Sequence, residues 1–153
     1  MICRWQKQPR GLTLAALALL VVSTASATEL SGSVDKVIDG DTFYVCDDAA
    51  CSKIRLCGIN APERGKPGGQ ESTEFLKALV LKKFVRCVQV GKGTLCDGRS
   101  RSTSHDRFVA QCFLNGTDIA AILVKHGVAC DWVKFSGGAY SEDSEAKRCR
   151  MRF

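Results

Sequence analysis

Charged side chains of the kind that act on phosphate esters gather in one short stretch, residues 37–63. Asp39 and Asp41 flank a glycine, Arg55 lies within an apolar run, and Glu63 follows an Ala-Pro dipeptide. A polar reversal separates the β-like runs that carry Asp41 and Arg55, so the pattern predicts a hairpin with both side chains at one rim. Oxygen ligands, a guanidinium and a free carboxylate at one rim favour the binding of a phosphodiester.

Several oxygen atoms near this rim suit a hard cation such as Ca²⁺. We expect ligands from the Asp41 carboxylate, the Asn60 side chain and the Ala61 carbonyl, with Asp39 acting through water. The ion would hold and polarise a phosphate oxygen. The alternative is a purely structural turn, because Asp-Gly-Asp is common where glycine adopts a positive φ and aspartate binds neighbouring amides.

Three charged residues are predicted to act on the phosphate itself. Glu63, positioned by the rigid turn before it, is expected to accept a proton from the attacking water, with a plain surface acid as the alternative. Arg55 and Arg107 are expected to bind non-bridging oxygens, because a planar guanidinium can bind two of them at once. A charge within an apolar strand needs a partner, so the alternative for Arg55 is a pair with Asp41 or Glu63.

Four further residues complete the expected substrate contacts: Thr42, His105, Trp132 and Phe135. Thr42 directly follows the second aspartate. His105 lies in a polar loop, where a solvated histidine is the simpler interpretation. Trp132 and Phe135 are placed to stack on bases, as in proteins that bind single strands, and packing in the core is an equal alternative.

The predicted elements alternate between periods of two and 3.6 residues. Strands are predicted at residues 30–38, 42–46, 53–59, 84–90 and 107–114, and helices at 71–83, 118–126 and 141–150. We expect Thr117 to cap the second helix, residues 91–105 to form a polar loop, and residues 135–140 to be loop. Five strands with a helix between the third and fourth predict a β-rich α+β fold, a five-stranded OB-type barrel with about three helices.

The first 27 residues have the pattern of a secretory signal peptide. A basic start precedes an apolar run that is short for a membrane span, and Ala-Ser-Ala ends the segment. An uncleaved anchor is the alternative. We therefore expect one domain at residues 28–153, secreted or periplasmic, with no stable membrane association after cleavage. Three basic residues leave with the signal, so the chain's charge of +6 falls to about +3, which permits a polyanionic partner without requiring one.

Of the nine cysteines, eight follow the predicted signal. An even number in an exported chain indicates a disulfide framework, although eight cysteines allow about 105 pairings. Zinc is the weaker interpretation, because the chain has no Cys-x-x-Cys pair and only two histidines. Two pairings are candidates: Cys46 with Cys51 across the hairpin, and Cys87 with Cys112 between strands.

Together these motifs resemble the thermonuclease (staphylococcal nuclease-like) family. The resemblance covers about residues 37–140 and rests on residues 38–42, 54–56, 60–63, 106–107 and 123–129. It implies an OB-fold, Ca²⁺-dependent cleavage of DNA and RNA, a metal ligand at Asp41, transition-state contacts from Arg55 and Arg107, and a base at Glu63. The sequence departs from the family pattern at Asn60, where an aspartate is usual, and at His105-Asp106, where Tyr-Gly is usual.

The sequence therefore predicts an exported, monomeric, Ca²⁺-dependent nuclease that hydrolyses DNA and RNA with little sequence specificity. We expect it to act on single strands or frayed duplexes. Because Asn60 removes one negative charge from the expected metal shell, weaker Ca²⁺ binding follows. The alternatives are a catalytically weak OB-fold that only binds nucleic acid or a protein, and a small disulfide-stabilised protein whose acids hold a structural ion.

Overall fold

The computed structural model describes residues 28–91 and 93–141. The predicted signal peptide and all but the first residue of the predicted helix at 141–150 lie outside the described residues. No helix within the described ranges is long and apolar enough to cross a membrane.

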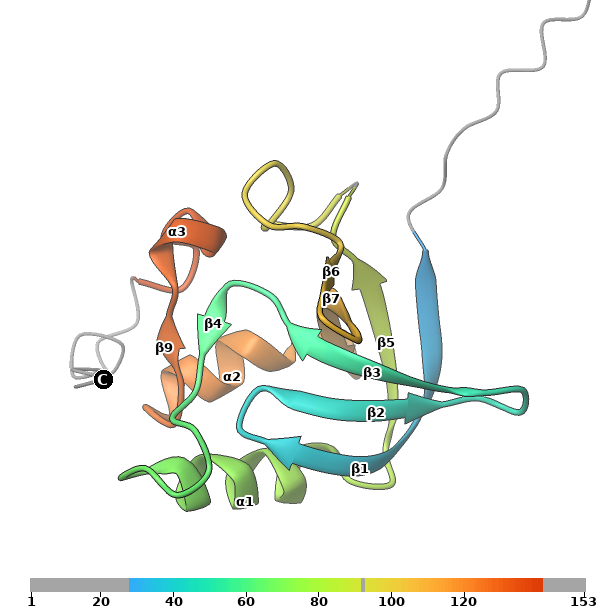
Figure 1. Cartoon of the computed structure of the whole chain (residues 1–153), viewed down its shortest axis with the longest axis horizontal. Coiled ribbons are helices and arrows are strands. Elements are labelled where there is room, and N and C mark those ends of the chain that lie inside the picture. The colour runs from blue at the N-terminus through green and yellow to red at the C-terminus, as the bar shows by residue number, and fades with distance from the viewer. Residues whose placement is uncertain (1–27, 92, 142–153) are drawn as a thin grey trace, which may run out of the picture.

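Five long strands form a closed barrel (Figure 1), which confirms the predicted fold. They are β1 (Glu29–Asp39), β2 (Thr42–Cys46), β3 (Cys51–Leu56), β5 (Phe84–Gln89) and β7 (Arg107–Leu114). The order is β3-β2-β1-β5-β7, and parallel pairing of β3 with β7 closes the barrel. Irregular register in β1 after Val34 and Val37 bends that strand, which pairs with β2 along one part and β5 along another.

Short strands flank the barrel, at both ends of β7 and in a separate two-stranded sheet. β4 (Ile59–Asn60) pairs with β9 (Cys130–Asp131), and β6 (Thr103–Ser104) and β8 (Thr117–Asp118) pair with β7. The predicted strand at 53–59 is therefore wrong at its end. β3 ends at Leu56 because Gly58, with a φ of 76°, turns the chain before β4 begins.

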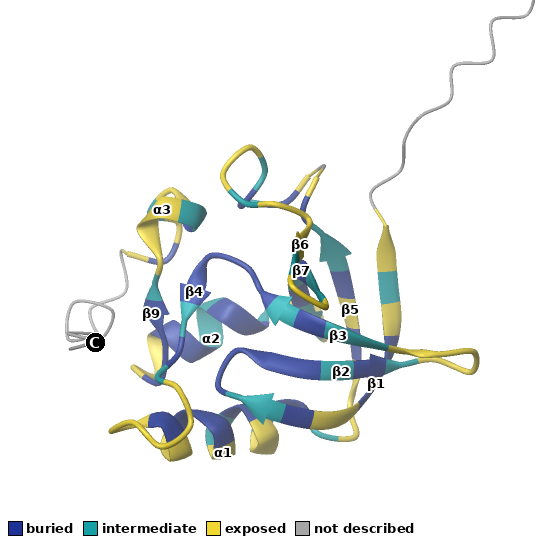
Figure 2. Cartoon of the chain, in the orientation of Figure 1, coloured by how far each residue is buried: buried dark blue, intermediate teal, exposed yellow. Residues whose placement is uncertain are grey.

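The helices cover the barrel and complete its core. α1 (Gly69–Val80) packs on β1, α2 (Ile119–Lys125) packs on β7, and the short α3 (Val133–Ser136) follows β9. Burial is concentrated where these elements meet (Figure 2). The fully buried side chains include Phe43, Ile54, Leu76 and Leu123.

Two local predictions about these helices were wrong. Asp118, and not Thr117, caps α2, because the Asp118 carboxylate accepts a hydrogen bond from Ala120 N at 2.8 Å while Thr117 is paired with Leu114. The segment predicted as loop from residue 135 begins inside α3, which ends at Gly137 in the left-handed conformation.

Both predicted disulfides are present, and the described residues contain a third complete pair. Cys46–Cys51 joins opposite residues of β2 and β3, and Cys87–Cys112 joins opposite residues of β5 and β7. Cys57–Cys96 ties the end of β3 to the loop that precedes β6. Cys130 is also disulfide-bonded. Such a framework is typical of proteins in an oxidising compartment outside the cytosol.

Candidate active site

A buried ion pair lies at the centre of the site. Asp41 follows the turn after β1, and its carbonyl accepts a hydrogen bond from Leu56 N at 2.9 Å, as the predicted hairpin requires. Arg55 Nη2 lies 2.9 Å from Asp41 Oδ2, and the two side chains are only 12% and 9% exposed. The anionic partner of Arg55 within the protein is therefore Asp41.

Other hydrogen bonds hold both members of this pair in place. Arg55 donates to the carbonyls of Leu56 and, at 2.9 Å, Ile59. Asp41 Oδ1 accepts from the Thr42 hydroxyl at 3.0 Å, and Oδ2 accepts from Ala61 N at 3.1 Å. The carboxylate and the guanidinium are thus fixed by the backbone of the turn before Ala61.

Burial also changes the proton affinity of the pair. Removal from water raises the pKa of Asp41 to about 6, with the nearby Asp39 charge adding to the rise and the Arg55 guanidinium opposing it. The same burial lowers the pKa of Arg55 from its usual value, although the charge of Asp41 opposes that change. A carboxyl group with a raised pKa inside a cavity is a common feature of functional sites.

Arg107 joins this cluster from the first residue of β7. Its Nη1 lies 3.4 Å from the Thr42 hydroxyl, and Nε and Nη2 each lie 3.3 Å from oxygens of Ser104. Thr42 therefore links Arg107 to Asp41, and Ser104 orients the guanidinium. The neighbouring Asp106 points to Lys53, 3.0 Å away, so a lysine compensates its negative charge.

These side chains surround a cavity of about 290 Å³. Seven predicted site residues line it: Asp41, Arg55, Asn60, Glu63, Arg107, Trp132 and Phe135. Glu63 is exposed, and its carboxylate makes no hydrogen bond or ion pair with other described residues. The cavity thus has fixed positive charge on one side and an unengaged carboxylate that solvent can reach.

Four predicted site residues do not line the cavity. Thr42 is buried beneath it, Ala61 contributes its N–H to Asp41, and Asp39 accepts a hydrogen bond from Asp41 N at 3.1 Å. These three position the cluster. His105 is exposed in the turn between β6 and β7, where its φ of 55° turns the chain.

The aromatic pair at the cavity is not part of the core. Trp132 is 41% exposed, and its ring lies edge-on to that of Phe135 with centroids 4.6 Å apart. Both residues line the cavity, from the end of β9 into α3. An exposed aromatic surface beside the guanidinium groups of Arg55 and Arg107 is suited to contact with a base.

Gly40 makes a contribution that its sequence context did not reveal. Its φ is not positive, so the turn does not require glycine for that reason. Instead, a Cβ at this position would lie 1.9 Å from Ser72 Oγ and 2.7 Å from Ala61 Cβ. The lack of a side chain at Gly40 therefore lets Ser72 of α1 and Ala61 lie close to the turn that carries Asp41.

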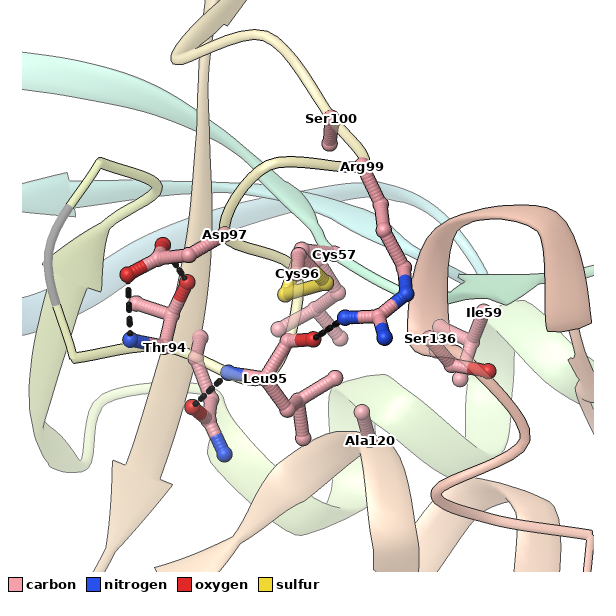
Figure 3. The surroundings of a disulfide bond; sticks show 12 residues. Cys57, Ile59, Thr94, Leu95, Cys96, Asp97, Arg99, Ser100, Ala120 and Ser136 are labelled. Atoms are coloured by element: carbon pink, nitrogen blue, oxygen red, sulfur yellow. Dashed lines mark hydrogen bonds between the residues drawn. A yellow bond between two sulfur atoms is a disulfide. The ribbon is translucent and has the colours of Figure 1, made fainter.

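Two cavity residues were not singled out by the sequence, Ser100 in the loop before β6 and Ser104 in β6 itself. The Cys57–Cys96 disulfide anchors this loop beside the end of β3 (Figure 3). Asp97 holds the loop internally, accepting hydrogen bonds from Gly91 N at 2.9 Å and Thr94 N at 3.1 Å. The polar, glycine-rich composition of residues 91–105 predicted a polar loop, but it did not identify which serines line the cavity.

The described residues contain no group of three or more His, Cys, Asp or Glu side chains arranged to hold a metal ion. The side-chain carboxylate and amide oxygens in the cavity wall are those of Asp41, Asn60 and Glu63, and Ser100 and Ser104 add hydroxyl groups. The site is therefore sparse in carboxylates and rich in guanidinium groups.

An OB-type barrel with a cavity of about 290 Å³ at its rim, lined by Arg55 and Arg107, defines the class of protein. Residues 53–149 match the model of the family described as Staphylococcal nuclease homologue, and the chain belongs to that family. It is 28% identical over 145 residues to a protein named Micrococcal nuclease from Shigella flexneri, covering 90% of this chain and 81% of the relative.

Two further relatives match over shorter parts of their length. The chain is 39% identical over 71 residues to Protein ParB of Escherichia coli, covering 46% of this chain and 40% of ParB. It is 31% identical over 126 residues to a protein named Uncharacterized endonuclease from Haemophilus influenzae, covering 82% of this chain and 65% of the relative. The chain thus spans less than two thirds of both of these relatives.

Proposed function

We propose that this protein is a nuclease that hydrolyses phosphodiester bonds of DNA and RNA with little sequence specificity. The observation that carries the proposal is the common cavity of Arg55, Arg107 and Glu63, which come from three separate segments of the chain. Two guanidinium groups match the negative charge of a phosphate, and the free carboxylate matches a base. The names of the relatives agree with this activity.

We infer that Ca²⁺ is the cofactor, and the chemistry of the available atoms fits it. Asp41 and Asn60 both present oxygen atoms to the cavity, and Asn60 makes no side-chain hydrogen bond with the described residues. These two residues would hold the ion, and Ca²⁺ accepts water and phosphate oxygens for its remaining positions. Bound there, it would supply positive charge to a phosphate oxygen. A site with so few carboxylates binds weakly.

In the proposed reaction, water attacks phosphorus and the bond to the leaving oxygen breaks. Glu63 accepts the proton from the water, and a solvent proton neutralises the leaving oxygen. Arg55 and Arg107 stabilise the charge that accumulates on the non-bridging oxygens. Trp132 and Phe135 contact a base. Stacking on an aromatic ring does not distinguish one base from another, which agrees with low sequence specificity.

The test is cleavage of fluorescent single-stranded DNA and RNA by the oxidised protein, in Ca²⁺ or in chelator. We expect cleavage that requires Ca²⁺ and that falls by about 10²–10⁴-fold in Glu63→Gln. Glu74→Gln is the matched control, because Glu74 is exposed on α1 and, within residues 28–91 and 93–141, forms an ion pair only with Lys77. Equal activity of Glu63→Gln and Glu74→Gln would overturn the assignment of the base.

A second candidate is a module that binds nucleic acid without cutting it. The lack of a three-carboxylate or histidine metal cluster among the described residues favours this alternative. It predicts that the oxidised protein binds single-stranded DNA equally in Ca²⁺ and in chelator, with no product formed. Asn60→Asp then distinguishes a weak metal site from none, because a new carboxylate should tighten Ca²⁺ binding measured by calorimetry.

We also propose that residues 1–27 direct export and are removed, leaving a monomer in the periplasm or the medium that is not attached to the membrane. The disulfide framework supports an oxidising destination. Mass spectrometry of the protein from culture fractions tests the cleavage, and sedimentation tests the monomer.

A further inference from the structure

A second cavity, of about 440 Å³, adjoins the first. The two cavities share Ser100, Ser104, Val109 and Phe135 in their walls. The shared residues include one aromatic ring and two hydroxyl groups. A ligand too long for the first cavity can therefore continue into the second without leaving the protein surface.

Positive charge distinguishes the second cavity. Arg99 and Arg101 both line it, both are exposed, and neither forms an ion pair with an acid in the described part of the chain. The acid nearest in sequence, Asp97, is occupied by backbone amides and the Thr94 hydroxyl. The two guanidinium groups are thus available to an anion from outside the protein.

The loop that carries these arginines is held in place. The Cys57–Cys96 disulfide anchors it, and Arg99 Nη1 lies 3.4 Å from the carbonyl of Leu95. The Arg99 side chain extends towards the end of α3 (Figure 3). There its guanidinium packs on Gly137, where a Cβ would lie 2.8 Å from Arg99 Cζ. Arg99 therefore joins the loop to α3, while Arg101 makes no such contact.

We propose that the second cavity binds a backbone phosphate next to the one that is cleaved, in a single-stranded polynucleotide. Arg101 is the main phosphate ligand, Arg99 is the second, and Phe135 stacks on the base between the two phosphates. Proteins that bind single strands combine such a charged path for the backbone with aromatic rings for the bases. The proposal rests on the proposed nuclease function and adds a subsite for longer substrates.

The test compares kcat/KM for a dinucleoside monophosphate and an octanucleotide. We expect Arg101→Gln to lower the octanucleotide value by about tenfold, the effect of removing one charged hydrogen bond, and to leave the dinucleoside value unchanged. We expect the salt slope of octanucleotide binding to fall by about 0.7 for each phosphate that the variant no longer neutralises. Arg86→Gln is the matched control, because Arg86 pairs with Glu29 and lines neither cavity.

The outcomes separate this inference from the proposed function. Equal losses on both substrates, or no loss on either, overturn the subsite while wild-type cleavage upholds the nuclease. If the wild type cuts neither substrate, octanucleotide binding is measured by fluorescence anisotropy. Weaker binding by Arg101→Gln but not Arg86→Gln then supports the subsite without the activity, and unchanged binding overturns it.

Discussion

The two adjoining cavities are built in opposite ways, the first with a barrel wall and the second with a loop wall. The barrel wall carries Asp41 and Arg55, which are almost completely buried, paired with each other and bound to backbone atoms. The loop wall carries Arg99 and Arg101, which are exposed and without an ion pair among the described residues. A disulfide anchors the loop wall, whereas strand pairing and core packing hold the barrel wall.

This difference separates two tasks. Stabilising a transition state requires charges that do not move, and buried, hydrogen-bonded groups provide them. Holding a flexible polymer requires accessible charges on a surface that follows its backbone. Substitutions of Asp41 or Arg55 in the barrel wall should therefore change both stability and kcat, whereas substitutions of the exposed arginines in the loop wall should change the binding of long substrates alone.

The largest effect is expected from Arg55→Gln. Removing the guanidinium leaves Asp41 buried without its charged partner, so we expect a loss of about 3–5 kcal/mol in the free energy of unfolding, and of about 10²–10³-fold in kcat. Arg107→Gln should lower kcat similarly but lower the free energy of unfolding by less than about 1 kcal/mol, because Arg107 is only half-buried and has no ion pair among the described residues. Urea unfolding and initial rates measure both, and equal destabilisation by the two substitutions would contradict the assignment.

Removing disulfides tests the loop wall. Cys57 and Cys96 are 39 residues apart, so replacing both by alanine should cost about 4 kcal/mol, and the double replacement of Cys46 and Cys51, 5 apart, about 2 kcal/mol. Only the replacement of Cys57 and Cys96 should also raise KM for the octanucleotide, because that disulfide anchors the loop that carries Arg99 and Arg101. The same KM change in both variants would show that the loop needs no anchor.

Gly40→Ala tests the support behind the barrel wall. The new Cβ would overlap Ser72, so we expect a loss of about 1–3 kcal/mol in stability together with reduced cleavage. Combining it with Ser72→Gly should restore part of both. Gly65→Ala is the control for backbone strain, because Gly65 has a φ of 84° but no atom within 4 Å of the added Cβ. The explanation is wrong if Ser72→Gly gives no recovery.

The last effect concerns pH and acts through Asp41 alone. The pKa of Asp41 is raised from 3.8 to about 6 by burial, so between these values the folded protein keeps a proton that the unfolded chain has lost. Its contribution to stability is therefore fully present below the unfolded pKa and is lost as pH rises through about 6. We expect the difference in unfolding free energy between wild type and Asp41→Asn, measured in chelator, to change over this range. A constant difference would show that Asp41 is ionised throughout.

Much of the barrel wall follows from local sequence patterns. Three features could be predicted because alternation and turn chemistry act over a few residues. They are the β7 boundaries at Arg107 and Leu114, the hairpin that closes at Cys46–Cys51, and the set of charged residues. The break after β3 was missed, because an apolar run continues through it and only Gly58 marks the turn. The α2 cap was assigned to Thr117 because Thr117 and Asp118 are both suitable residue types.

The loop wall was not predictable in this way. The composition of residues 91–105 indicates a polar loop, but its position depends on Cys57, which lies 39 residues from its partner. The role of Gly40 likewise depends on Ser72, a contact between a turn and a helix that are distant in the chain.

By itself, the sequence determined the kind of barrel and the inventory of charged groups, and it favoured the Cys46–Cys51 disulfide, because these depend on side-chain periodicity and on neighbours across a hairpin. Only the tertiary structure decided that Arg55 is paired with Asp41, that Thr42 connects this pair to Arg107, and that a second arginine-lined cavity adjoins the first. The physical reason is that a local pattern records neither which candidate partner a buried charge selects nor the contacts of distant segments, such as Thr42 and Arg107, which are 65 residues apart.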